Sequence, residues 1–188
     1  MRLGVLVSGR GSNLEAIIGA RFDVVIVVSN RPEARALTVA GTRGIPTRTL
    51  RRAAFADAEA RDAAIGEALT GARVELAVLA GYDQLLSPSY FAAFAGRTIN
   101  IHPSLLPAHG GPGMIGLAVH RSVLDAGNAE TGVTIHEVTH ELDAGSILAQ
   151  SRIAVVPGDD PATLAARVLE EEHRLLVGTI AGIAAGQC

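Results

Sequence analysis

The chain has 188 residues, of which 48% are apolar and 19% charged, with 21 glycines; this composition is typical of a compact α/β protein rather than a disordered one. The net charge of -3 argues against an extended nucleic-acid surface, which would need a basic stripe. All 16 basic residues are Arg, which excludes a Lys Schiff base, a Lys general base and a phosphate-loop Lys.

The sequence also limits where the protein works. No apolar run approaches the roughly 20 residues that a membrane helix needs, and the chain starts with a strand-like run rather than a signal or transit peptide. Its one cysteine, Cys188, excludes disulfide scaffolds and thiolate metal sites. We therefore expect a cytoplasmic protein without nucleic-acid or membrane partners; the sequence leaves open whether it is a monomer or a homodimer.

Strands and helices are predicted to alternate along the chain. Continuous apolar runs predict buried strands at residues 3–7, 24–28, 74–79 and 98–101, and a short extended piece at 45–49. Helices are expected at 14–18, 33–40 and 54–70, after Pro88, between Ile115 and Gly127, and from Asp160-Pro161 onward. Two strands at 132–138 and 146–156 are close enough in sequence to pair antiparallel.

This alternation predicts right-handed βαβ units in one domain. The expected fold is α/β, a mostly parallel twisted sheet with helices on both faces and an antiparallel edge near the C-terminal part. Ligands of such sheets bind at the carboxyl ends of the strands. The loops at 8–13, 80–87 and 100–113 would all lie there.

The most informative pair of residues ends the strand at 98–101. Asn100 and His102 are polar side chains two residues apart, so they leave the same side of an extended backbone, which Pro103 favours for His102. A satisfied core amide and a loop-capping His would be the ordinary explanation. Together at a strand end, however, they suit an oxyanion donor and a general acid.

The loop 8–13, Ser-Gly-Arg-Gly-Ser-Asn, connects a strand to a helix and could bind an anion through its backbone N–H groups. A dinucleotide fingerprint would need Gly at position 14, which is Leu14, so a single phosphate monoester fits better. The alternative is a tight turn in which Ser12 and Glu15 form a capping box. The residues of this loop are compatible with both the phosphate site and the tight turn.

Three other features could contribute to a site. Asp143 could orient His102 or simply belong to an Asp-Ala-Gly turn. His136 and His140 have the four-residue spacing of a metal pair, but they fall on or near a predicted strand, so a zinc site with Asp143 is a minority alternative. Glu172 lies on the apolar face of the last helix, where a carboxylate is costly unless it is paired or faces a site.

These residues together resemble the folate-dependent formyltransferases, and specifically the branch acting on phosphoribosylglycinamide. The resemblance covers nearly the whole chain and rests on residues 7–14, 79–81, 86–88, 100–107, 131–136 and 142–143, and on Arg167-Val168 with Glu172-His173. It implies a Rossmann-like formyltransferase fold in a single domain, residues 1–188, with a phosphate-binding half at about 1–95 and a catalytic and folate half at about 96–188.

The resemblance also implies a reaction and a set of site residues. A formyl group would pass from 10-formyltetrahydrofolate, the co-substrate, to the amine of glycinamide ribonucleotide in purine synthesis, without a metal. The implied catalytic residues are Asn100, His102 and Asp143. The implied ribonucleotide contacts are Gly11, Ser12, Asn13, Gly81, Pro103 and Glu172. The implied folate contacts are Leu85, Leu86, Val138, Thr139, His140 and Asp143.

The chain departs from the family pattern at several places. Gln84 stands where the family often has Arg, Ala58 where some members place an Arg near the folate tail, and Leu169 where a polar residue is common. The loop 108–114 is longer than in many members. The alternatives are a formyltransferase for another amine, such as an amino-sugar nucleotide, and a non-catalytic nucleotide-binding module that uses only the loop 8–13.

Overall fold

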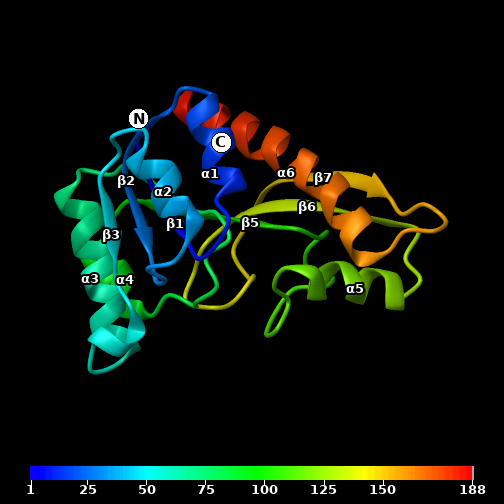
Figure 1. Cartoon of the computed structure of the whole chain (residues 1–188), viewed down its shortest axis with the longest axis horizontal. Helices are drawn as coiled ribbons and strands as arrows, with labels where there is room; N and C mark the ends of the chain where they lie inside the picture. The colour runs from blue at the N-terminus through cyan, green and yellow to red at the C-terminus, as the bar shows by residue number, and fades with distance from the viewer. Residues whose placement is uncertain (188) are drawn as a thin grey trace. The chain divides into compact units, whose positions relative to one another are not determined.

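A computed structural model describes residues 1–187, so Cys188 lies outside the described residues (Figure 1). The elements follow one another in the order β1 (Arg2–Val7), α1 (Ser12–Gly19), β2 (Asp23–Ser29), α2 (Arg35–Gly41), β3 (Thr47–Thr49), a 3-10 turn (Arg52–Ala54), α3 (Ala58–Gly71), β4 (Leu76–Leu79), α4 (Pro88–Ala93), β5 (Arg97–His102), α5 (Leu117–Asp125), β6 (Glu130–Glu137), β7 (Ile147–Ala154) and α6 (Pro161–Ala184).

The strands form a seven-stranded sheet in the order β3-β2-β1-β4-β5-β6-β7. β1 runs parallel to β2 and β4, and β2 runs parallel to β3, whereas β6 and β7 are antiparallel. The predicted α/β class and its antiparallel edge are therefore confirmed. Two compact units divide the chain, Met1–Ile99 and Asn100–Cys188, and their boundary falls inside β5. The expected assignment of phosphate binding to one half and catalysis to the other stays a prediction.

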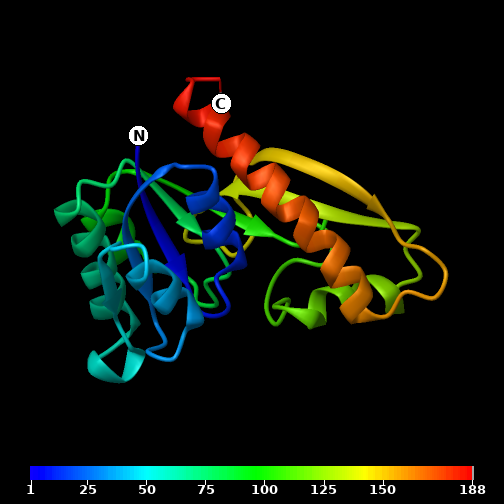
Figure 2. The same cartoon turned by 45° about the horizontal axis from the view of Figure 1, so that its top comes forward.

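The first unit has its core around β1. Val5 pairs with Val27 of β2 and with Val78 of β4, and all three are fully buried. Because both faces of these strands are covered, their sequences are continuous apolar runs rather than alternating ones. Helices α1 and α2 lie on one face of these strands and α3 and α4 on the other (Figures 1 and 2).

The second unit is built on β6, β7 and the long helix α6, which runs along both strands and also contacts α5 (Figure 2). Asp160 caps α6: its carboxylate accepts from the N–H groups of Ala162 and Thr163, and the Thr163 hydroxyl closes a capping box. The predicted start at Asp160-Pro161 is thus confirmed. The buried face of α6 contains Leu164, Val168 and Leu176, with Glu172 among them.

Local capping explains where two helices differ from the sequence prediction. Helix α3 begins at Ala58 rather than near 54, because the Asp57 side chain accepts from the Ala60 N–H at 2.8 Å and fixes the helix start there. The suggested Ser12–Glu15 capping box is wrong. Helix α1 is preceded by Gly11 in the left-handed conformation, with φ of 84°, and no side chain caps it.

Among residues 1–187, no helix is long and apolar enough to cross a membrane.

Candidate functional site

Asn100 and His102 are the last polar residues of β5. Asn100 is half-buried and His102 is buried; Ile99 before them and Ile101 between them are buried as well. The alternation along the strand puts the two polar side chains on the same side, as the sequence predicted. Pro103 follows directly, where β5 has ended.

The Asn100 amide is oriented by a histidine that the sequence analysis considered only as a metal ligand. Asn100 Nδ2 lies 3.1 Å from His136 Nε2, and His136 Nδ1 lies 2.8 Å from the Glu137 carbonyl oxygen. A carbonyl only accepts, so His136 carries its proton on Nδ1 and accepts the Asn100 N–H at Nε2. Burial lowers the pKa of His136, although the Glu137 carbonyl and Asp143 oppose that shift. His136 therefore stays neutral near pH 7 and fixes which way the amide points.

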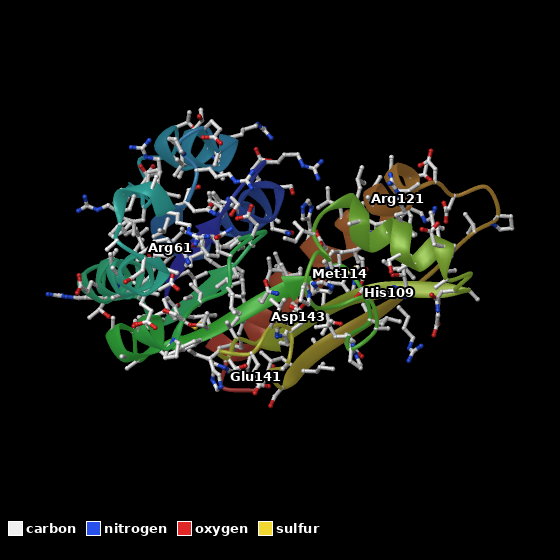
Figure 3. The ribbon with its side chains drawn as sticks, turned by 90° about the horizontal axis from the view of Figure 1, so that it is seen from below. Arg61, His109, Met114, Arg121, Glu141 and Asp143 are labelled. Carbon is white, nitrogen blue, oxygen red and sulfur yellow. The ribbon has the colours of Figure 1, made fainter. Side chains whose placement is uncertain are left out.

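Asp143 reaches the same place from the loop between β6 and β7. Its Oδ2 lies 3.9 Å from His102 Nδ1 and its Oδ1 lies 3.6 Å from His136 Nε2. Oδ2 also accepts the Gly111 N–H at 2.8 Å; Asp143 itself is labelled in Figure 3. Asp143 has φ of 53°, a left-handed conformation that Asp tolerates better than most residues. The structure thus brings Asn100, His102 and Asp143 together.

His102 also donates to a neighbouring loop. Its Nε2 lies 2.9 Å from the His109 carbonyl oxygen, so Nε2 carries a proton. The His109 ring is in turn held by the Ser122 hydroxyl at 2.7 Å and the Asn128 side-chain oxygen at 3.1 Å. The backbone of His109 has φ of 55°. This anchored loop occupies the proton-donating side of His102 and leaves Nδ1 facing Asp143.

The zinc alternative finds no site in the described part of the chain. Residues 1–187 contain no group of three or more His, Cys, Asp or Glu side chains that could hold a metal ion. His136 uses both ring nitrogens in the contacts above. His140 lies in the loop after β6, next to Thr139, whose hydroxyl bonds to the backbone of Glu141. Val138 leads into that loop.

The loop 8–13 connects β1 to α1 in the first unit and packs closely against its neighbours. A Cβ on Gly11 would lie 2.8 Å from Ala36 Cα, so only glycine fits there. The Ala36 N–H donates to the Gly9 carbonyl at 3.1 Å, and the Ser8 N–H donates to the Gly81 carbonyl at 3.0 Å. Ser12 and Asn13 begin α1, so their N–H groups lie in the first turn, where helices attract anions. Gly81 is thus fixed beside the strand end from which the loop starts.

A network around Asp83 was not foreseen from the sequence. Its Oδ1 accepts from the Ser8 hydroxyl at 2.9 Å and from Asn30 Nδ2 at 2.7 Å, and its Oδ2 pairs with Arg31. Burial raises the pKa of Asp83, but hydrogen bonds from Asn30, Ser8 and Gln84 and the Arg31 charge outweigh it and hold the pKa below its usual value. The available signal was that Asn30 and Asp83 both follow buried strands of one parallel sheet.

The remaining predicted contacts are distributed over both units. Leu85, half-exposed, and Leu86, buried, lie in the irregular segment between β4 and α4 of the first unit. Glu172 is buried on α6 of the second unit. The structure therefore brings the three residues predicted to be catalytic, Asn100, His102 and Asp143, together within one unit, and Gly81 together with the loop 8–13 within the other.

The sequence matches the formyl transferase family model over residues 1–180. It is 39% identical to phosphoribosylglycinamide formyltransferase of Escherichia coli over 193 residues, covering 100% of this chain and 89% of that protein. It is also 39% identical to the trifunctional purine biosynthetic protein adenosine-3 of Drosophila melanogaster, covering 92% of this chain but only 13% of that much longer protein.

Solved structures agree with this fold. Glycinamide ribonucleotide transformylase 1 from Symbiobacterium toebii superposes with a TM-score of 0.92 at 38% identity, over 99% of this chain and 88% of that one. Phosphoribosylglycinamide formyltransferase from Brucella melitensis superposes with a TM-score of 0.88 at 43% identity, over 100% of this chain and 97% of that one.

Proposed function

The chain belongs to the formyl transferase family, which uses a folate-derived formyl donor, and we propose that it transfers the formyl group of 10-formyltetrahydrofolate to the amine of glycinamide ribonucleotide. The reaction would be a step of purine synthesis. Two relatives similar over nearly their whole length carry the name of this activity, which supports the choice of acceptor over another amine.

The reaction is an acyl transfer between two nitrogens. The amine lone pair attacks the formyl carbon, a new C–N bond forms, and the carbonyl π electrons move onto the oxygen. When the tetrahedral intermediate collapses, the oxygen returns its electron pair and the bond from carbon to the folate nitrogen breaks. One proton leaves the attacking amine and one reaches the departing folate nitrogen, so the net proton transfer is from one nitrogen to the other.

In this proposal Asn100 and His102 stabilise the oxyanion. The Asn100 amide has two N–H donors; one is directed to His136, and the other is assigned to the formyl oxygen. The Nε2–H of His102 now donates to the His109 carbonyl oxygen. The formyl oxygen would replace this carbonyl as the acceptor of the same proton.

Asp143 is assigned the negative charge that balances a positive charge on the His102 ring. With Nε2 donating to the His109 carbonyl oxygen, Nδ1 of His102 faces the Asp143 carboxylate at 3.9 Å. A second proton on Nδ1 would place an imidazolium beside the carboxylate, an attractive pair in a buried site. The charged ring is the stronger oxyanion donor. Asp143 would also help the amine proton leave through water.

The single observation that carries this proposal is the convergence of an oriented amide, a buried imidazole and a carboxylate at the end of β5. The test follows 10-formyltetrahydrofolate consumption with and without glycinamide ribonucleotide. We expect turnover only when both are present, and a loss of roughly 10²- to 10⁴-fold in kcat for His102→Ala. Asp143→Ala should also be impaired, whereas Arg48→Ala, an exposed change on β3, should retain full activity.

Two results would overturn the assignment. Near wild-type turnover by His102→Ala and Asp143→Ala would remove the catalytic roles. Consumption of the donor that does not depend on the ribonucleotide would remove the proposed acceptor. Thermal melts of each variant separate lost chemistry from lost folding.

A further inference from the structure

Two adjacent charged residues of α3, Arg61 and Asp62, are buried in the first unit. Their side chains are 2% and 0% exposed. Arg61 Nε lies 2.8 Å and Nη2 lies 2.6 Å from Asp62 Oδ1. Burying an ion pair is costly, and an apolar pair of similar volume often stabilises a fold as well or better. The pair therefore needs an explanation beyond packing.

Arg61 and Asp62 also bond, through their other polar atoms, to one short segment, residues 84–87. Arg61 Nη1 donates to the Gln84 side-chain oxygen at 3.2 Å, and Nη2 approaches the Leu85 carbonyl oxygen at 3.5 Å. Asp62 Oδ2 accepts the Ser87 N–H at 2.8 Å. A guanidinium offers five N–H donors in a fixed fork, so it can bind a carboxylate and this segment at once. Figure 3 labels Arg61 among the side chains of the first unit.

The segment 84–87 has no helix or strand of its own to hold it. It leads from the end of β4 to α4, and Ser87 is the residue that precedes that helix. Leu86 is anchored in the core at 1% exposure, while Leu85 is 50% exposed. The Leu85 carbonyl and the Ser87 N–H, on either side of Leu86, thus bond to side chains of α3. The conformation of Leu85 therefore depends on the ion pair.

We propose that Arg61 and Asp62 are positioning residues for the formyl donor. They hold segment 84–87 in the conformation in which Leu85 and Leu86 contact the pterin ring of the donor. This inference rests on the proposed function, because Leu85 and Leu86 are folate contacts only as the resemblance to the formyltransferases implies. The ion pair does not touch the donor; it acts through the Leu85 carbonyl and the Ser87 N–H.

Two variants of the pair test this role. Arg61→Lys keeps the charge beside Asp62 but loses the fork that reaches Gln84 and Leu85. The double variant Arg61→Met with Asp62→Leu removes both charges together, so that no buried charge is left unpaired. Asp57→Ala is the matched control: it removes the cap of the same helix without touching segment 84–87.

We expect both variants of the pair to raise KM for 10-formyltetrahydrofolate roughly tenfold, the effect of losing one or two hydrogen bonds that order the segment. KM for glycinamide ribonucleotide and kcat should stay within about twofold of wild type. Hydrogen exchange of the Ser87 amide should accelerate in the double variant, which lacks its acceptor. Asp57→Ala should lower Tm while leaving both KM values unchanged.

Unchanged KM for the donor in both variants would overturn the positioning role. The role would also be overturned if the variants of the pair lost activity in all kinetic parameters together and Asp57→Ala showed the same losses. That pattern would mean that the variants only fold less well. Calorimetric binding of the donor alone keeps this test separate from the proposed function. If wild-type protein binds the donor but does not formylate the ribonucleotide, the acceptor assignment fails, and weaker donor binding by Arg61→Lys still supports the positioning role.

Discussion

The hydrogen bond from Asn100 to His136 allows a quantitative test of the proposed oxyanion site. The perturbation is His136→Phe, which keeps an aromatic ring in the buried position but removes the acceptor 3.1 Å from Asn100 Nδ2. His136→Gln is the conservative partner, because its side-chain oxygen can still accept from the amide. The prediction is that His136 acts through Asn100 and not on the substrate.

The expected magnitudes differ enough to be measured. Losing one neutral hydrogen bond costs roughly 0.5–1.5 kcal/mol, which corresponds to about a 2- to 12-fold fall in kcat if orientation of the amide is what is lost. Removing the oxyanion donor itself, by Asn100→Ala, should cost roughly 2.7–4 kcal/mol, or 10²- to 10³-fold. His136→Gln should lie between wild type and His136→Phe.

A double-mutant cycle with initial-rate measurements decides between the two roles. If His136 only orients the amide, adding His136→Phe to Asn100→Ala should change kcat little further. Additive losses in the double variant would refute this reasoning, as would a loss in His136→Phe alone that equals the loss in Asn100→Ala. Either result would mean that the imidazole acts directly on the reacting groups.

Two further predictions concern stability. Gly11→Ala should lower Tm by several degrees, at about 2–4 °C per kcal/mol, because the φ of 84° at Gly11 and the Cβ contact of 2.8 Å with Ala36 both disfavour a side chain. Gly9→Ala is the control and should melt like wild type, since a Cβ there would meet nothing within 4 Å. Equal losses of Tm in the two variants would contradict the argument. Hydrogen bonds from Arg167 lower the pKa of Asp159 from 3.8 to about 2, so this carboxylate stabilises the fold above about pH 4 and loses that effect as the pH falls toward 2. The Tm difference between wild type and Asp159→Asn should therefore shrink over that interval, and a difference independent of pH would exclude the ion pair as its cause.

Sequence periodicity was sufficient for the fold because burial decides it. Continuous apolar runs such as Leu3–Val7 and Val24–Val28 occur only where both faces of a strand are covered, and the interruption of such a run at Asn100 and His102 indicated a site. Helix ends were harder, because they depend on individual backbone conformations. Ser12 and Glu15 have the spacing of a capping box, yet Gly11 adopts a left-handed conformation and no side chain caps the helix.

The residues that hold the candidate site residues in place could not be predicted, because they come from distant parts of the chain. His136 is 36 residues from Asn100 in the sequence, and nothing in its spacing from His140 distinguishes an amide acceptor from a metal ligand. Arg61 and Asp62 gave no signal either, since charged residues on a helix are ordinarily exposed. In the folded chain these two side chains bond to backbone groups of an irregular segment, at Leu85 and Ser87. The proposed site combines groups at strand ends, which sequence patterns indicate, with proposed positioning groups on neighbouring elements, which only the folded chain identifies.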